Sequence, residues 1–515
     1  MAATSKTDVV IDAAAEYATL TPDRQSVIDR GRAASKLTIP GLIPEEGQNE
    51  HSTFEQPYQS LGARCVSHLA SVSALALFPP GLPFFRLGVD EVTAQGLGTA
   101  LGEANEKLAV LARTAYALME KAVLRPAISS VLRHLIVAGN VLLYTPEEKA
   151  ARIYRIDQYV CRRDHNGDVL RIIVKESVYP TALDETTRAT TGLADAASDK
   201  QRVDLYTVVN RNGDNVEWWQ TVKGVEIAGT RGSAPSDKSP WLALRWLAVP
   251  GSDYGRSQVT EYIGDFLSLE DLYKSMVQFA AVAARVVHIV DPNSGIDIDE
   301  LAEAESGDFI TGYADRVQVL QLDKYNDWRV MSDLAERLEK RLSAAFLLQT
   351  GVMRDAERVT AEETRIVAQE LESGLGGTYT ILSSELQLPL TRRFLYIGTR
   401  VGTIPALPDS VVPIVVTGFD ALGRAQGVNR LRAYVADLQA MLGPDAVNRV
   451  LNADELARRL GEGSGVDGLA DLLKSPEQQQ ADAQQSQQAA AMQAAAPQIA
   501  KGAVDAATQA PPENQ

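Results

Sequence analysis

A heptad pattern in the middle of the chain is the feature that most limits its possible folds. Between residues 253 and 290, apolar or small side chains recur at alternating intervals of four and three residues. This seam comprises Tyr262, Phe266, Leu269, Tyr273, Met276, Ala280, Ala283 and Val287. The spacing predicts a helix over 257–288, about 48 Å long, that packs against other helices along its whole length. Few compact enzymes need such a rod in mid-chain, whereas a protein that lines a channel with helices does.

Length, charge and cysteine content further limit the classes of protein to which the chain can belong. A chain of 515 residues has room for a large core and more than one domain. Its net charge of −17 makes it a poor candidate for tight binding of DNA or RNA, because that binding depends on neutralising phosphates. The same charge suits a wall that nucleic acid passes without sticking. Two cysteines, Cys65 and Cys161, cannot form a disulfide framework, which predicts assembly in a reducing cytoplasm.

Neither a membrane span nor a signal peptide is expected. The most apolar run, 279–290, is shorter than the roughly 18 to 20 residues that a span needs, and it carries Arg285 and His288. Residues 1–20 lack a basic region followed by an apolar core.

Blocks of helix and strand are predicted before the rod. Helices are expected over about 1–36, 57–78, 100–122 and 124–138, and the last has Gly139 and Asn140 in position for a left-handed cap. From 141 to 250 the sequence consists of runs rich in Val, Ile, Tyr and Trp. Two Asn-Gly pairs, at 166–167 and 212–213, predict hairpin turns in a mostly antiparallel sheet. The stretch 181–202, rich in Thr, Ala and Asp, is predicted to be a loop.

A small mixed module is predicted after the rod, over 296–327. It should contain a short helix near 297–305 and strands at 308–313 and 317–322. A second long helix is expected over about 328–350, with one face formed by Val330, Leu334, Leu338, Leu342 and Ala345.

The rest of the chain alternates breaks and helices. Residues 351–358 form a break of alternating charge, and a capping box of Thr360 and Glu363 restarts a helix. That helix is interrupted at Gly374, Gly376 and Gly377 and resumes over about 379–396, with a predicted kink at Pro389. Residues 404–474 are predicted to be a linker and short helices. Residues 475–515, rich in Gln and Ala, are predicted to be disordered.

Catalytic and cofactor chemistry is missing from the sequence patterns. The five histidines are not paired at metal-ligand spacing, and neither a nucleophile elbow nor a phosphate-binding loop occurs. The glycines of 96–102 do not follow a strand, so they are not a dinucleotide fingerprint. We therefore expect no enzyme activity, no cofactor and no metal, and any motor that drives movement must be another protein.

Several stretches, taken in order, resemble one protein family. They are TIPGLIPEE (38–46), ALALFPPGLPFFRL (74–87), LIVAGNVLLY (135–144), YGRSQVTEYIGDFLSLEDL (254–272), GDFITG (307–312) and RVTAEETRIVAQELESGLGGTYTILSSELQLPL (358–390). The sequence resembles the portal proteins, or head-to-tail connectors, of short-tailed bacteriophages. The resemblance implies a mainly helical α+β fold with wing, stem, clip and crown regions that assembles as a ring.

The resemblance also implies a division of the chain. It places a wing at 1–252, which includes the β-rich region 141–250, and a crown at 404–474 before the tail 475–515. Between them it implies stem helix 1 at 253–290, the clip at 291–327, stem helix 2 at 328–350, the tunnel loop at 351–360 and a kinked wing helix at 361–403.

A portal's task and partners follow from the resemblance in the same way. The ring, usually of twelve copies, would occupy one capsid vertex of the virion after assembly in the host cytoplasm. Double-stranded DNA would pass through it without sequence recognition, inward during packaging and outward during ejection. Its partners would be the terminase large subunit, the tail adaptor, the capsid and scaffolding proteins and the internal core proteins, with no membrane contact.

Two candidate sites are implied beside the seam. The tunnel loop would present Gly351, Val352, Met353, Arg354, Asp355, Ala356, Glu357 and Arg358 to the channel. Arg354 and Arg358 could touch DNA phosphates, or they could pair with Asp355, Glu357 or a neighbouring subunit. The clip interface would include Asp308, Phe309, Ile310 and Thr311.

One alternative of another class stays open at this point. A cytoplasmic coiled-coil scaffold or adaptor protein that never meets DNA would also need a long apolar seam. A dimer in solution would favour the scaffold, and a ring would favour the portal.

Overall fold

The computed structural model describes most of the chain in segments. These are residues 12–48, 51–79, 83–97, 101–193, 201–283, 287–291, 297–305, 309, 317–320, 325–348, 377–415 and 431–441, with positions 451, 456, 457 and 460. The chain divides into two compact units, residues 1–419 and 420–515.

The N-terminal part of the first unit is helical, as the sequence predicts. Its helices are α1 (Ala13–Leu37), α2 (Leu61–Leu77), α3 (Glu91–Leu97), α4 (Leu101–Lys121) and α5 (Leu124–Ala138). Gly139 ends α5 with a φ of 76°, which confirms the predicted left-handed cap. A side chain at Gly139 would meet the backbone of Arg256 at 2.5 Å, so space as well as conformation demands glycine there.

The predicted antiparallel sheet region is confirmed, although it forms two sheets. The larger contains β4 (Tyr159–Arg163), β5 (Val169–Val178), β6 (Val203–Asn212), β7 (Asn215–Val222), β8 (Val225–Glu226) and β9 (Gly232–Pro235). The smaller, in the order β10-β2-β3, contains β10 (Trp241–Arg245), β2 (Asn140–Tyr144) and β3 (Arg152–Tyr154). Short 3-10 turns, η2 (Pro180–Ala182) and η3 (Ser236–Lys238), flank the strands.

Two local predictions in this region need correction. Residues 181–202 were predicted to be a loop, but they contain the short helix α6 (Glu185–Thr190). Asp184 caps it by accepting a hydrogen bond from the Thr187 backbone N–H at 3.1 Å, which makes a Thr-rich stretch helical. The second hairpin turn is displaced by one residue, because Asn212 pairs with Asn215 and leaves Gly213 and Asp214 as the turn.

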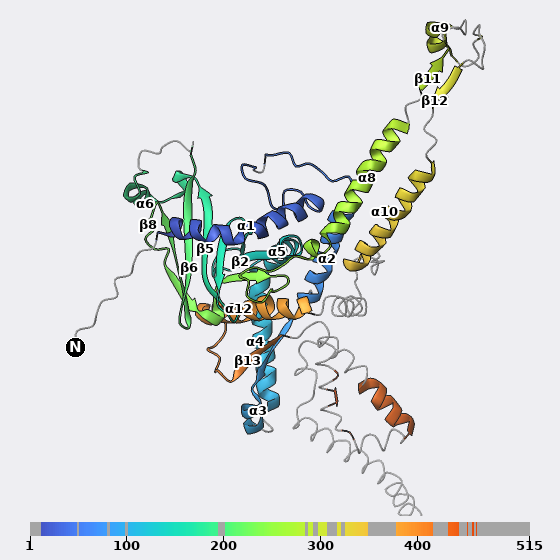
Figure 1. Ribbon diagram of the computed structural model, residues 1–515. Coiled ribbons are helices and arrows are strands. Elements are labelled where there is room, and N and C mark those ends of the chain that lie inside the picture. The colour runs from blue at the N-terminus through green and yellow to red at the C-terminus, as the bar shows by residue number, and fades with distance from the viewer. Residues whose placement is uncertain are drawn as a thin grey trace, which may run out of the picture. The chain divides into compact units, whose positions relative to one another are not determined.

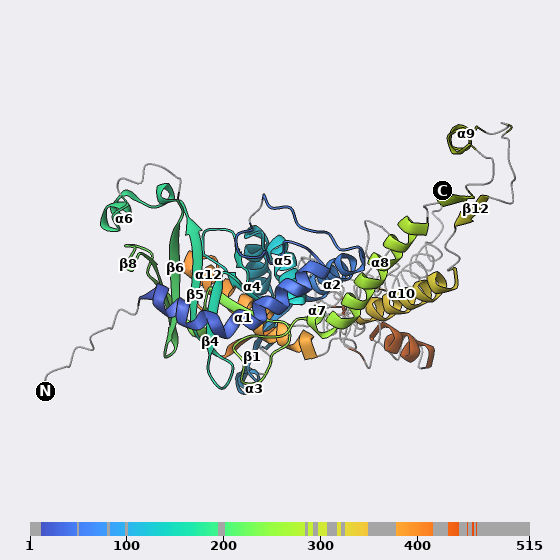
Figure 2. The ribbon, with the colours of Figure 1, turned by 45° about the horizontal axis from the view of Figure 1, so that its top comes forward.

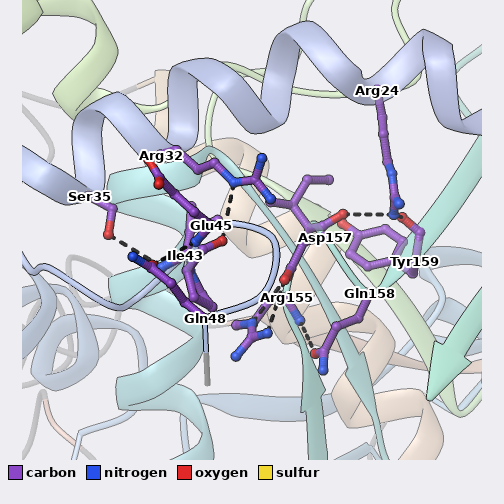
Figure 3. A network of polar contacts seen from close by, with 12 residues as sticks. Arg24, Arg32, Ser35, Ile43, Glu45, Gln48, Arg155, Asp157, Gln158 and Tyr159 are labelled. Atoms are coloured by element: carbon purple, nitrogen blue, oxygen red, sulfur yellow. Dashed lines mark hydrogen bonds and ion pairs between the residues drawn. The ribbon is translucent and has the colours of Figure 1, made fainter. Parts of the chain in front are cut away.

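Helix α1 lies across the larger sheet and is fastened to it by a buried arginine. Arg24, 4% exposed, donates to the backbone carbonyls of Ile156 and Tyr159 and to the Tyr17 hydroxyl. Figure 3 shows this side chain reaching from α1 to Tyr159. Apolar residues of α1 complete the packing, because Tyr17 and Leu20 cover Val160, Ile173 and Val208 of the strands.

The predicted rod is shorter than its heptad pattern indicates. A one-turn helix α7 (Gln258–Glu261) leads into α8 (Ile263–Ala283), and the chain then forms β11 (Val287–Val290). The predicted helix end at 288 is therefore wrong. Three of the four residues of β11 are β-branched, which favours a strand over a helix.

A small module and a second helix follow. The module contains α9 (Ile298–Glu303) and β12 (Val317–Leu320), which pairs antiparallel with β11. Helix α10 (Tyr325–Ala345) then returns beside α8, as Figures 1 and 2 both show. The predicted strand 308–313 lies outside the described residues except for Phe309, which is not in a strand.

The last helix of the first unit contains a π-turn where a kink was predicted. It runs over 377–382, through the π-turn η5 (Ser383–Gln387), into α12 (Leu388–Val401), and Pro389 is the second residue of α12. Buried residues recur every four positions, at Thr378, Leu382, Leu386, Leu390 and Phe394. A regular helix repeats every 3.6 residues, so the wider π-turn keeps this spacing on one face.

A strand appears where only linker and helices were predicted. β13 (Val411–Val415) pairs antiparallel with β1 (Phe85–Val89), so residues more than 300 positions apart in the sequence share a sheet. In the second unit, residues 431–441 are helical. The predicted capping box at 360–363 and the tail 475–515 lie outside the described residues.

Candidate functional site

Helices α8 and α10 form an antiparallel pair, and an aromatic cluster joins one end of it. Phe346, which follows α10 and is fully buried, contacts Tyr262 and Phe266 edge-to-face at centroid distances of 5.9 and 5.6 Å. At the far end, the rings of Phe279 and Trp328 stack at 5.8 Å. The contacts therefore run along both helices.

Polar contacts between the two helices fix their register. Tyr273 donates a hydrogen bond to the Glu339 carboxylate, which raises the pKa of Tyr273 to about 12. Arg341 of α10 pairs with Asp265 of α8. A slide of one helix along the other would break both contacts.

The predicted seam residues do not all lie in one helical face. Phe266 and Leu269 are fully buried, whereas Tyr273 and Met276 are half-buried. Ala280 is exposed and Ala283 is the last residue of α8. Tyr262 lies between α7 and α8, and Val287 is the first residue of β11, so neither is in the helix. The buried part of the seam packs against α10 of the same chain.

The buried face of α10 differs from the predicted face. Leu338 and Leu342 are buried as predicted, but Val330 and Leu334 are 67% and 47% exposed. Ala335 and Phe346 are buried instead, and Phe346 contacts Phe266 of α8. Val330 and Leu334 therefore form an apolar strip that no described residue of the first unit buries. On α8, the large apolar side chains that are exposed are those of Leu267, Val277 and Val282.

Two contacts attach the base of the pair to the helical part of the unit. The Glu270 carboxylate accepts hydrogen bonds from the backbone N–H groups of Tyr58 and Gln59, at 2.8 and 3.2 Å. The His68 Nε2 lies 3.0 Å from the Leu347 carbonyl oxygen, where α10 has just ended. Leu347 has a φ of 57°, a left-handed conformation that usually takes glycine.

A partly buried ion pair attaches the π-turn to the smaller sheet. Glu385 accepts from the Arg245 Nε at 3.0 Å, from its Nη2 and from the Arg245 backbone N–H at 3.1 Å. Gln387 donates to the Leu77 carbonyl oxygen at 2.6 Å, at the end of α2. Neither contact was predicted. A lone Glu and a lone Arg 140 residues apart carry no sequence signal of their pairing.

The other predicted site residues are sparsely described. Asp308, Ile310 and Thr311 of the clip interface lie outside the described residues, and Phe309 is 99% exposed. All of the tunnel loop, 351–358, lies outside them too.

Metal-binding clusters and membrane-spanning helices are both absent from the described segments. These segments contain no group of three or more His, Cys, Asp or Glu side chains that could hold a metal ion. No helix within them is both long and apolar enough to cross a membrane.

Comparison with known proteins places the chain in a family. The family described as "Bacteriophage head to tail connecting protein" matches residues 12–470. The portal protein of Escherichia phage T7 is 35% identical over 507 residues, which are 96% of this chain and 94% of that protein. The portal protein of Enterobacteria phage T3 is 36% identical over 496 residues, with 93% and 92% covered.

Among solved structures, a chain from the virion of a native gene transfer agent particle aligns with 86% of this chain at 11% identity. The alignment covers 94% of that chain, but its TM-score of 0.38 is too low to support an inference about the fold. The sequence matches give no support to the alternative of a cytoplasmic scaffold. They confirm the family resemblance over nearly the whole chain, and the protein belongs to the bacteriophage head to tail connecting proteins.

Proposed function

We propose that this chain is the subunit of a portal, a closed ring of twelve copies at one vertex of a phage capsid. DNA passes through the ring during terminase-driven packaging and again during ejection, and the ring is the platform for the tail. The observation that carries the proposal is the match to two phage portal proteins over more than nine-tenths of either chain.

The regions of a portal can be assigned to the described elements. The wing comprises residues 1–252, with the two β-sheets, and the helix that includes α12. The stem is the pair α8 and α10, and the clip is the module of α9, β11 and β12. Because β13 pairs with β1, we place the start of the crown after residue 419 and not at 404.

The partners follow from this assignment. The clip would meet the terminase large subunit during packaging and the tail adaptor afterwards. The wing and crown would meet the capsid, scaffolding and internal core proteins. Double-stranded DNA is a passing ligand without sequence recognition, which suits an acidic chain. The ring belongs to the virion and assembles in the host cytoplasm.

Neighbouring subunits are proposed to meet through the outer faces of the stem. The inner faces of α8 and α10 are already occupied by each other, yet Val330 and Leu334 remain exposed side by side, four residues apart. Leu267, Val277 and Val282 are about half exposed on α8. In a ring, each stem has a neighbour on either side that can cover these surfaces.

Replacing Val330 and Leu334 together by aspartate is expected to convert rings to monomers without unfolding the subunit. In the free subunit both positions are open to water, but a ring contact would bury two unpaired charges per subunit. Native mass spectrometry and circular dichroism give the two readouts. The matched control is the double change of Val110 and Val225, which are also exposed, to aspartate. Intact V330D/L334D rings would remove this strip from the subunit contact.

Deletion of residues 351–358 is expected to leave rings intact while DNA packaging or retention is lost. The prediction rests on the implied position of this loop in the channel, and on Arg354 and Arg358 as its cations. Phage yield and the DNA content of purified heads measure the effect, and electron microscopy of the purified ring is the control. Normal packaging by the deletion variant would exclude the loop from the mechanism.

The test of the proposed function is negative-stain electron microscopy of the purified full chain, with native mass as a check. We expect rings with a central hole of at least about 20 Å, the width of a B-DNA duplex. Monomers or dimers at every protein and salt concentration would overturn the portal assignment.

A further inference from the structure

Three cations surround the ring of Tyr396 on α12. The Lys238 Nζ lies 6.0 Å from the centre of that ring, the Arg393 Cζ 5.6 Å and the Arg400 Cζ 5.9 Å. Lys238 belongs to η3, which packs against α12, while the two arginines are on α12 itself. Two separate elements of the wing therefore bring positive charges to one spot.

A single carboxylate faces these cations. The Glu147 Oε1 accepts from Arg400 at 2.8 Å and lies 3.5 Å from the nearest Arg393 nitrogen, so one oxygen serves both guanidinium groups. Among the described residues, no carboxylate forms an ion pair with Lys238. The cluster thus carries an excess of two positive charges in a chain of net charge −17.

Arg393 is the buried member of the cluster. Its side chain is 2% exposed, and each of its three nitrogens has one acceptor. Apart from Glu147, its hydrogen-bond acceptors are the Thr145 and Lys238 carbonyl oxygens at 3.4 and 3.5 Å, at the outer limit of a hydrogen bond. Burial lowers the pKa of Arg393. A guanidinium has five N–H donors, and leaving it buried with weak acceptors beside other cations is costly.

We propose that Lys238 and Arg400, together with the positive charge of the buried Arg393, form a phosphate-binding site over Tyr396. The planar guanidinium fork matches two phosphate oxygens, and the lysine adds a point charge. The Tyr396 hydroxyl is a further donor. A bound phosphate would offset the excess positive charge of the cluster. The phosphate can come from the DNA backbone, which rests on the proposed function, or from free phosphate in solution.

The DNA source is tested by fluorescence anisotropy of a labelled short duplex with the full-length protein over a series of NaCl concentrations. The variant K238Q/R400Q removes the two accessible cations and leaves buried Arg393 in place. We expect about tenfold weaker binding at low salt. The slope of log K against log salt should become shallower by about 1 to 2, because each phosphate that the protein no longer neutralises changes it by about 0.9. The matched control K36Q/R231Q also removes one exposed lysine and one exposed arginine, each from a surface ion pair.

Binding of free phosphate is tested by comparing thermal unfolding in inorganic phosphate with thermal unfolding in NaCl of equal ionic strength. We expect phosphate to raise the Tm of the wild type and of K36Q/R231Q but not that of K238Q/R400Q. A change in the DNA slope assigns the site to the phosphodiester backbone. An effect of inorganic phosphate alone assigns it to free phosphate.

If neither experiment separates K238Q/R400Q from the control, the site does not exist. Failure of the proposed function is a distinct result, because ring formation is measured by microscopy. Should the chain form no rings while the two double variants still differ, the phosphate site stands and the portal assignment falls.

Discussion

Replacing Glu385 by alanine is expected to destabilise the first unit by roughly 2 to 4 kcal/mol, somewhat less than breaking a fully buried ion pair, because one-fifth of the Glu385 side chain is exposed to water. Arg245 is 9% exposed, and the Glu385 carboxylate accepts from both its guanidinium and its backbone N–H. Without the carboxylate, a charge and an amide stay buried with no acceptor. The shift of the urea midpoint, followed by tryptophan fluorescence, measures the loss of stability.

Three companion variants make this result interpretable. E385Q keeps the acceptor oxygen and should lose less stability than E385A. The double variant R245M/E385L removes both charges and should recover much of the stability. E226A breaks the exposed pair with Arg231 and should cost less than about 1 kcal/mol. If E385A costs no more than E226A, the pair does not hold the π-turn to the sheet.

Replacing Phe346 by alanine is expected to cost roughly 3 to 5 kcal/mol and to separate the base of α10 from α8. The ring is fully buried between Tyr262 and Phe266, so its removal leaves a cavity and deletes two aromatic pairs. Urea unfolding measures the stability, and limited proteolysis within α10 reports the separation.

The control for this variant is Val110→Ala, at a position that is 55% exposed on α4. It should change stability by no more than about 0.5 kcal/mol. F346L fills part of the space and should lie between the two. Equal stability of F346A and V110A would show that the aromatic cluster does not hold the two helices together.

The sequence predicts elements well where the signal is local. The left-handed conformation at 139 favours glycine, and the two Asn-Gly pairs mark the two hairpins, although the second turn is formed by Gly213 and Asp214, one residue later than predicted. The same applies to α4 and α5, whose bounds agree with the prediction within about two residues.

Periodicity fails where it has to decide between competing structures. The heptad spacing continues through Val287, which favours a helix there. The same residues are β-branched and can also form a strand, and pairing with β12 stabilises the strand. On α10, leucines occur on adjoining faces, and only the contact with α8 selects Leu338 and Leu342 over Leu334.

Contacts between distant residues had no signal in the single sequence. The pairing of β1 with β13 and the charge pair of Arg245 with Glu385 join segments separated by more than 100 residues. The cluster at Tyr396 is hidden for the same reason, since Glu147 and Lys238 look like ordinary surface charges until the fold brings them to α12.

The π-turn has a consequence for which changes the gene can accept. Each residue of a regular helix turns the chain by about 100° and advances it by about 1.5 Å. The π-turn takes up one residue more than a regular helix needs for the same rotation. Deleting Ser383 or Ser384 would therefore let the segment close as ordinary helix, with Thr378 and Leu382 still on the same face as Leu390 and Phe394. In the regular turns on either side, a one-residue deletion would rotate one half of the helix by about 100° and move its buried residues out of the core. The gene should therefore accept the loss of a residue within the π-turn more readily than in the turns beside it.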